Sequence, residues 1–255
     1  MVFHAALIYK INLLFYNRYF AGKKYDGMAT RLIIDSSSQL QELKDQSWIV
    51  RLLAKIISYV FHPVFVPVYI ILFLLYVHPG VFAGFSPFKK TIVLLQALLP
   101  YVVLPVVTVF LLKALNFIEN VTLVTRKDRI IPYIACNLWY FWIAYVWYNQ
   151  ADYPKEIIIL AIGIFISSVI GQLVNIYMKI SMHAIAMGLA VSFMLLVALM
   201  QTASSGVYVS VSLFIAGLVC TARLLVSNHT QKDIYGGLLS GVAGILIASL
   251  FVGIY

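Results

Sequence analysis

The residues of this chain best suited to chemistry lie in the segment RLLVSNHTQKD, which runs from Arg223 to Asp233. Arg223, His229 and Asp233 follow one another at intervals of six and four residues, beside sequence that is almost purely apolar. A histidine can act as a nucleophile or transfer protons, and a carboxylate one helical turn away can fix its tautomer. An arginine binds anionic oxygens. The segment therefore predicts a functional site.

Ionisable side chains are scarce in the second half of the chain, which makes their grouping informative. Beyond Glu156 the basic, acidic and histidine residues form two short clusters, which are Lys179 with His183, and Arg223 with His229, Lys232 and Asp233. Asp233 is the only carboxylate side chain among them. Charged groups at or near membrane depth are costly, so such clusters indicate a functional site by default.

The composition excludes an ordinary soluble domain. Hydrophobic residues make up 63% of the chain and charged residues 11%, with a mean hydropathy of +0.96. Soluble domains hold about 45–50% apolar and about 25% charged residues. We predict an all-α, polytopic transmembrane helical bundle of six to seven spans. The candidate spans lie near residues 52–77, 91–115, 132–148, 157–178, 184–201, 207–226 and 234–254.

The first 47 residues differ in character from the remainder, because basic residues interrupt an aromatic-rich and then polar sequence. We therefore divide the chain into a basic, partly amphipathic N-terminal segment, residues 1–47, and a transmembrane domain, residues 48–255. The segment from Val2 to Phe20 is expected to lie on the membrane as an interfacial helix, with an additional span as the alternative. The net charge of +9 favours membrane lipids as partners, and not nucleic acid, because anionic headgroups attract juxtamembrane Lys and Arg.

Three polar clusters should face the same side of the membrane, since an even number of predicted spans separates each pair. They are Glu119 to Arg129, Lys179 to His183, and Ser227 to Asp233. Together they supply several cations, two hydroxyls and two histidines, namely Arg126, Lys127, Arg129, Lys179, Arg223, Lys232, Ser181, Ser227, His183 and His229. Cations and donors of this kind suit a phosphoryl group, whose transfer depends largely on positioning and electrostatic stabilisation.

The clusters resemble three motifs of the type-2 phosphatidic acid phosphatase superfamily, which are membrane lipid phosphatases, and suggest a divergent bacterial-type member. The third motif reads Ser-Arg, five residues, His, three residues, Asp, and the stretch from Ala222 to Asp233 keeps every spacing with alanine in place of the serine. The second motif, Pro-Ser-Gly-His, is similar to Ile180-Ser181-Met182-His183. The first motif, Lys, six residues, Arg-Pro, is similar only to the stretch from Arg126 to Pro132.

The resemblance implies a metal-independent hydrolase without a cofactor that removes phosphate from a lipid. His229 would be the nucleophile that forms a phosphohistidine, Asp233 its orienting partner, and His183 the general acid. The phosphoryl oxygens would be bound by Arg223, Ser181 and Arg129, with Arg126 and Lys127 nearby. Candidate substrates are a polyprenyl diphosphate, phosphatidic acid and phosphatidylglycerol phosphate.

The departures from the motifs leave two alternatives open. Without the proline and glycine around Ser181, the chain could be an inactive protein that binds or transports phospholipids, since Met182 cannot adopt every glycine geometry. A phosphotransferase of the same family is the other alternative. His4, His62 and His78 are expected to be structural, and Cys136 and Cys220 to be small hydrophobic residues.

The distribution of basic residues predicts the side on which the site lies. In the seven-span interpretation, 15 of the 18 Lys and Arg residues lie in the N-terminal segment or the loops that carry the clusters. The positive-inside rule then places the site on the cytoplasmic face of a bacterial inner (plasma) membrane. An additional N-terminal span would reverse this orientation.

Overall fold

The computed structural model describes residues 31–34, 40–43, 47–118, 126–200, 206–227 and 229–253, without the side chains of 31–34, 40–43 and 126–128. The chain divides into two compact units, Met1–Ser47 and Trp48–Tyr255. In the first, strands β1 (Arg31–Ile34) and β2 (Leu40–Leu43) pair antiparallel, so strand structure accompanies the otherwise helical fold. The predicted interfacial helix from Val2 to Phe20, and His4 within it, lie outside the described residues.

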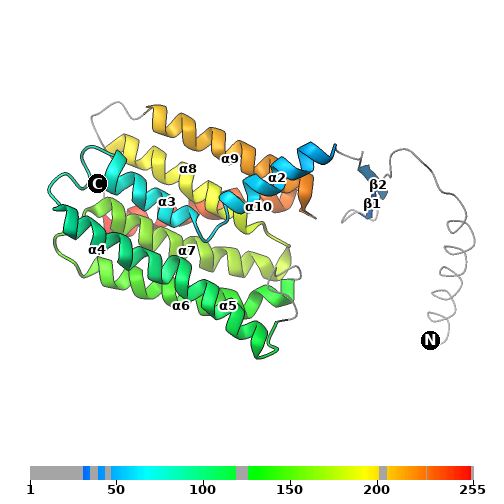
Figure 1. Cartoon of the computed structure of the whole chain (residues 1–255), viewed down its shortest axis with the longest axis horizontal. Helices are drawn as coiled ribbons and strands as arrows, with labels where there is room; N and C mark the ends of the chain where they lie inside the picture. Colours follow the sequence, from blue (N-terminus) through cyan, green and yellow to red (C-terminus); the bar gives the residue numbers. More distant parts are fainter. Residues whose placement is uncertain are drawn as a thin grey trace, which may run out of the picture. The chain divides into compact units, whose positions relative to one another are not determined.

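The second unit is helical throughout its described part, and its long helices run side by side (Figure 1). The helices are α2 (Trp48–Val60), α3 (Val66–Leu72), α4 (Pro87–Leu98), α5 (Leu104–Ala114), α6 (Arg126–Tyr148), α7 (Lys155–Tyr177), α8 (Met182–Met200), α9 (Gly206–Val226) and α10 (Gln231–Val252). There are two π-helical turns. The turn η1 (Phe73–Val77) continues α3, and the turn η2 (Leu99–Val103) joins α4 to α5. Pro100 within η2 and Pro105 just after it cannot donate backbone hydrogen bonds, which accounts for the irregular turn at η2.

Six of the described helices are long and apolar enough to cross a membrane, which fits a multi-pass membrane protein. They comprise Pro87–Ala114, Arg129–Tyr148, Lys155–Tyr177, Met182–Met200, Gly206–Val226 and Gln231–Val252. These helices correspond to six of the seven predicted spans, with ends that differ by a few residues. The described part of the chain therefore confirms a helical bundle, with six of the predicted six to seven spans present as long apolar helices.

The first predicted span, residues 52–77, is wrong as a continuous helix. Helix α2 ends at Val60, and an apolar helix over Val66–Val77 follows after a turn. Pro63 lies in this turn, and a proline disfavours helical geometry in the residue before it, here His62. The 12 residues of Val66–Val77 extend about 18 Å at 1.5 Å per residue, less than the roughly 30 Å hydrocarbon core.

The segment between α2 and α4 nevertheless runs the length of the bundle. At its start, the His62 ring lies 5.4 Å from the ring of His183, which follows the C-terminal end of α7. Near its end, Phe85 packs 6.0 Å from the ring of Tyr153, which precedes the N-terminal end of α7. The two ends of this segment therefore lie at opposite ends of the bundle, as they would for a spanning segment.

Helix α10 packs closely along both α7 and α8 because small residues line its contact surface. A methyl group at Gly241 would collide with the backbone of Ile185 on α8, and one at Gly244 would collide with Ser167 on α7. At Gly237 it would lie 2.7 Å from the Cβ of Ala184. These three glycines therefore permit the close helix packing, and Gly237 and Gly241 hold α10 against the first half of α8.

Candidate phosphate site

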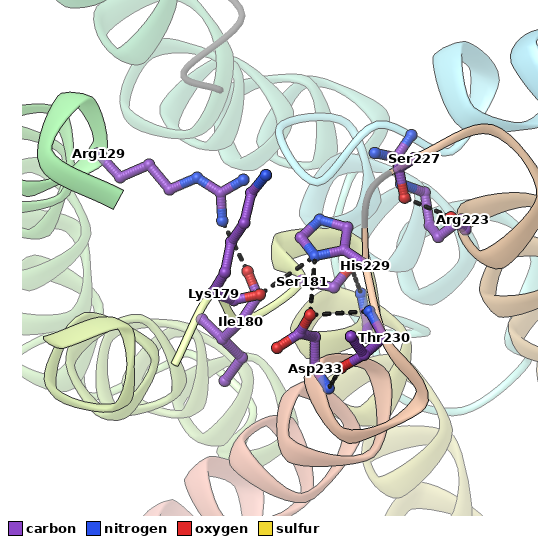
Figure 2. A network of polar contacts seen from close by, with 10 residues as sticks. Arg129, Lys179, Ile180, Ser181, Arg223, Ser227, His229, Thr230 and Asp233 are labelled. Atoms are coloured by element: carbon purple, nitrogen blue, oxygen red, sulfur yellow. Dashed lines mark hydrogen bonds and ion pairs between the residues drawn. The ribbon is translucent and has the colours of Figure 1, made fainter. Parts of the chain in front are cut away.

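The predicted site residues gather where α6, α8 and α10 begin and α9 ends. Arg129 lies in the first turn of α6, His183 in the first turn of α8, and Arg223 in the last turn of α9. His229 precedes α10 by two residues (Figure 2). Three helix N-termini at one place favour an anion, because the N-terminal end of a helix dipole is positive.

Local sequence fixes where α10 begins and hence where His229 lies. Thr230 and Asp233 form a capping box. The backbone N–H of Thr230 donates to Asp233 Oδ2 at 2.8 Å, and that of Asp233 donates to Thr230 Oγ1 at 3.3 Å (Figure 2). Each side chain satisfies a backbone donor that the helix leaves unpaired. His229 therefore lies immediately outside the helix, and Asp233 lies in its first turn.

Ser181 has the same kind of role at the start of α8. Its side chain is fully buried, and Oγ accepts a hydrogen bond from the backbone N–H of Ala184 at 3.4 Å. Its own backbone N–H donates to the carbonyl oxygen of Asp233 at 3.3 Å. Ser181 therefore joins the starts of α8 and α10 and caps one of them.

The tautomer of His229 follows from its contacts. Nδ1 lies 3.1 Å from the carbonyl oxygen of Lys179 and 3.7 Å from Asp233 Oδ2 (Figure 2). A carbonyl oxygen only accepts hydrogen bonds, so Nδ1 carries the hydrogen in this contact. In the neutral ring, the lone pair is then on Nε2, which is the nitrogen that can attack an electrophile.

The surroundings keep His229 neutral. Burial lowers its pKa from the ordinary value, the positive charges of Arg129 and Arg223 lower it further, and Asp233 opposes the shift. The pKa of the Lys179 ammonium is also lowered, mainly by burial and then by Arg129. His229 is therefore unprotonated near neutral pH, as a nucleophile requires.

The two arginines are held differently. Arg129 is buried, and its Nη1 donates to the carbonyl oxygen of Ile180 at 2.7 Å, which links α6 to the segment before α8 (Figure 2). The Nε atom of Arg223 is buried and has no hydrogen-bond partner among the described residues. A buried donor of this kind favours an anionic ligand, because leaving a charged group unsatisfied is costly.

His183 is fixed by the end of α2. Its Nε2 lies 3.0 Å from the carbonyl oxygen of Ser58, so Nε2 carries a hydrogen and donates it in this contact. Nδ1 is therefore the ring nitrogen that remains available to give or accept a proton. The ring is half-buried and packs edge to face with that of His62.

Some of these polar residues line a cavity of about 450 Å³. Its ionisable lining residues include His62, Arg129, His183, Arg223 and His229. Most of the remaining lining is apolar or aromatic and includes Val106, Val109, Phe110, Ile164 and Leu189. Cations and histidines that share a cavity with apolar walls suit an amphiphile whose phosphate reaches the histidines while its tail lies against the walls.

The predicted site residues differ in their relation to the cavity. Arg129, His183, Arg223 and His229 line it, whereas Ser181, Lys179 and Asp233 are not among the lining residues. Arg126 and Lys127 lie in the first turn of α6, with side chains outside the described part of the structure. Within that part, no three His, Cys, Asp or Glu side chains are grouped as metal ligands would be.

Two contributions from the end of α2 were missed by the sequence reasoning. His62 was expected to be a structural turn residue and lines the cavity, and the carbonyl of Ser58 contacts His183. A backbone carbonyl leaves no signal in a sequence. His62 had one available signal, because Pro63 disfavours helical geometry in the residue before it and so marks a break inside the predicted span 52–77.

No protein-family model, curated protein or solved structure matches this chain.

Proposed function

We propose that the protein is an integral membrane phosphatase that hydrolyses a phosphate monoester or diphosphate of a lipid through a phosphohistidine intermediate. The observation that carries the proposal is the shared cavity of His229, His183, Arg129 and Arg223, whose other walls are largely apolar. The arginines would bind the phosphoryl oxygens, and the apolar walls would hold the lipid next to the headgroup.

The reaction would proceed in two steps. In the first, the Nε2 lone pair of His229 attacks phosphorus, the bond from phosphorus to the lipid oxygen breaks, and His183, which enters as the imidazolium, gives its Nδ1 proton to that oxygen. In the second, water attacks the phosphohistidine and gives a proton to His183 while the phosphorus–nitrogen bond breaks. The products are a lipid alcohol, or a lipid monophosphate from a diphosphate, and inorganic phosphate, and both histidines return to their starting states.

The test is phosphate release by purified protein in detergent from phosphatidic acid, a polyprenyl diphosphate and phosphatidylglycerol phosphate, with a chelator present. The wild type should release phosphate from at least one lipid. His229→Ala should reduce release by about 10⁴-fold or more, because it removes the nucleophile. Lys232→Ala is the matched control, since this exposed residue of the same segment does not line the cavity, and it should retain activity. A folded wild type that is inert with all three lipids would refute the proposal.

The position of Ser181 favours a second candidate, a protein that binds or transports lipid phosphates without chemistry. Its hydroxyl caps α8 and the residue does not line the cavity, so one phosphate ligand implied by the resemblance is used elsewhere. Equal lipid affinity of the wild type and His229→Ala, with no phosphohistidine trapped after an acid-free quench, would support this candidate. Phosphate transfer to an added lipid alcohol instead of water would indicate a phosphotransferase.

A further inference from the structure

The turn that follows α2 forms one wall of the cavity. His62, Pro63, Val64 and Val66 all line it, and His62 is exposed there. These residues lie more than 100 positions before His183 in the sequence, so tertiary packing alone brings them to the site.

Two groups, one in the last turn of α2 and one in the turn that follows it, contact the ring of His183. The carbonyl oxygen of Ser58 accepts a hydrogen bond from Nε2 at 3.0 Å, and the ring of His62 lies 5.4 Å from that of His183 with an interplanar angle of 82°. The hydrogen bond restrains one ring atom, and the edge-to-face contact restrains the plane of the ring. Ser58 and His62 lie four residues apart, so a small part of the fold provides both restraints.

His62 is itself held in place. Its Nδ1 accepts a hydrogen bond from the backbone N–H of Val64 at 3.4 Å, and its carbonyl oxygen accepts one from that of Phe65 at 2.8 Å. The ring of Phe65 packs against it with a centroid distance of 6.2 Å. The turn therefore presents the ring of His62 to His183 in a defined orientation.

We propose that His62 is a positioning residue for His183, a role that rests on the function proposed above. Because Nε2 of His183 donates to Ser58, Nδ1 is the nitrogen that gives a proton to the leaving oxygen and takes one from water. His62 keeps the ring in the plane that directs Nδ1 to these oxygens. His62 itself exchanges no proton, so the two reaction steps proposed above remain balanced without it.

The chain contains a matched control in its second His-Pro pair, His78-Pro79. Nδ1 of His78 likewise accepts backbone hydrogen bonds, from Gly80 and Val81 at 3.3 Å each, and its ring packs 5.8 Å from that of Phe73. His78 is buried and is not among the residues that line the cavity. The two histidines thus have the same turn chemistry, and only one of them contacts His183.

The experiment compares two substrates that differ in their need for a general acid. Phosphatidic acid must lose an alkoxide, whereas 4-nitrophenyl phosphate loses a phenolate that needs no proton. His62→Ala should lower kcat/KM for phosphatidic acid by about 10-fold to 100-fold, since misplacement of a catalytic group by about 1 Å can cost about 100-fold. We compare kcat/KM because it covers only the steps up to release of the leaving group and not the hydrolysis of the phosphohistidine, which both substrates share. The kcat/KM for 4-nitrophenyl phosphate should change by less than about threefold, a result that also shows the variant is folded.

Two further variants complete the test. His62→Phe retains a ring for the edge-to-face contact and should recover most of the kcat/KM for phosphatidic acid, whereas a proton-transferring role would not be rescued. His78→Ala should leave the ratio of the two kcat/KM values unchanged. The proposal is overturned if His62→Ala lowers kcat/KM equally for both substrates, if it lowers neither, or if His62→Phe has as low a kcat/KM for phosphatidic acid as His62→Ala. A wild type inert with phosphatidic acid and with the other two lipids overturns the proposed function as well.

Discussion

At the scale of single residues, the orientation of His229 depends on two acceptors that are not equivalent. The carbonyl oxygen of Lys179 is within hydrogen-bonding distance of Nδ1, whereas Asp233 Oδ2 is 3.7 Å away and accepts a shorter hydrogen bond from the backbone of Thr230. The backbone carbonyl therefore sets the tautomer, and the carboxylate contributes a nearby negative charge and the cap of α10.

This arrangement predicts a mild effect of Asp233→Asn. The amide oxygen of asparagine can still accept from Thr230, and the Lys179 carbonyl still orients Nδ1, so the proposed lipid phosphatase activity should fall by only about 10-fold. Where a carboxylate alone fixes a catalytic histidine, the same change costs about 10⁴-fold. Steady-state kinetics with phosphatidic acid measure the difference, and a loss near 10⁴-fold would show that the carboxylate sets the tautomer. Thr230→Ala, which removes the other half of the capping box, controls for the stability of α10.

At the scale of the helices, the geometry of the site depends on the distance between α8 and α10. Gly237, in the second turn of α10, packs against the first turn of α8, and the backbone N–H of Ser181 donates to the carbonyl oxygen of Asp233 beside this contact. The same contact fixes His183 relative to His229. A wider separation of the helices would therefore move the proposed acid away from the proposed nucleophile.

Gly237→Ala should consequently reduce both stability and activity. The added methyl group would lie 2.7 Å from the Cβ of Ala184 and 2.8 Å from the carbonyl oxygen of Ser181, so the helices must shift. Overpacking of this kind costs about 1–3 kcal/mol, equivalent to a fall in Tm of about 2–10 °C. Thermal unfolding in detergent measures the change. Gly217→Ala on α9 has no atom within 4 Å of the new methyl group and should leave Tm unchanged, and an equal fall in both variants would contradict the packing argument.

At the scale of the whole molecule, the orientation of the site in the membrane follows from the course of the chain. The segment from His62 to Phe85 connects opposite ends of the bundle, so α2, with Arg51 and Lys55, belongs to the same end as the site. The loop between α6 and α7 lies at the other end. Since basic residues are concentrated at the site end, the positive-inside rule favours a cytoplasmic site.

Cysteine labelling tests this orientation. In a background with Cys136→Ala and Cys220→Ala, a cysteine at the exposed position Gln231 should react with an impermeant maleimide only after the membrane is opened. A cysteine at the exposed position Asn149 should react in intact cells. The reverse pattern would place the site on the outer face, and labelling of both positions from one side would contradict the course of the chain between them.

The sequence by itself determined the helical membrane domain, six of its spans and the grouping of the ionisable residues. Hydropathy and residue spacing are local properties, so they locate apolar helices and place Arg129, His183 and His229 at helix ends on one side. Residues 52–77 were misjudged, because the high apolar content on both sides of Pro63 outweighed the helix break that this proline marks.

Only the tertiary structure decided which groups complete the site. The carbonyl oxygens of Lys179 and Ser58 orient the two histidines, yet backbone atoms are common to every residue and carry no sequence signal. His62 lines the cavity because of how the helices pack, whereas the cap of α8 by Ser181 is a local contact with Ala184. Contacts between distant segments depend on interhelical distances set by residues such as Gly237, and a motif that specifies spacing along the chain does not contain them.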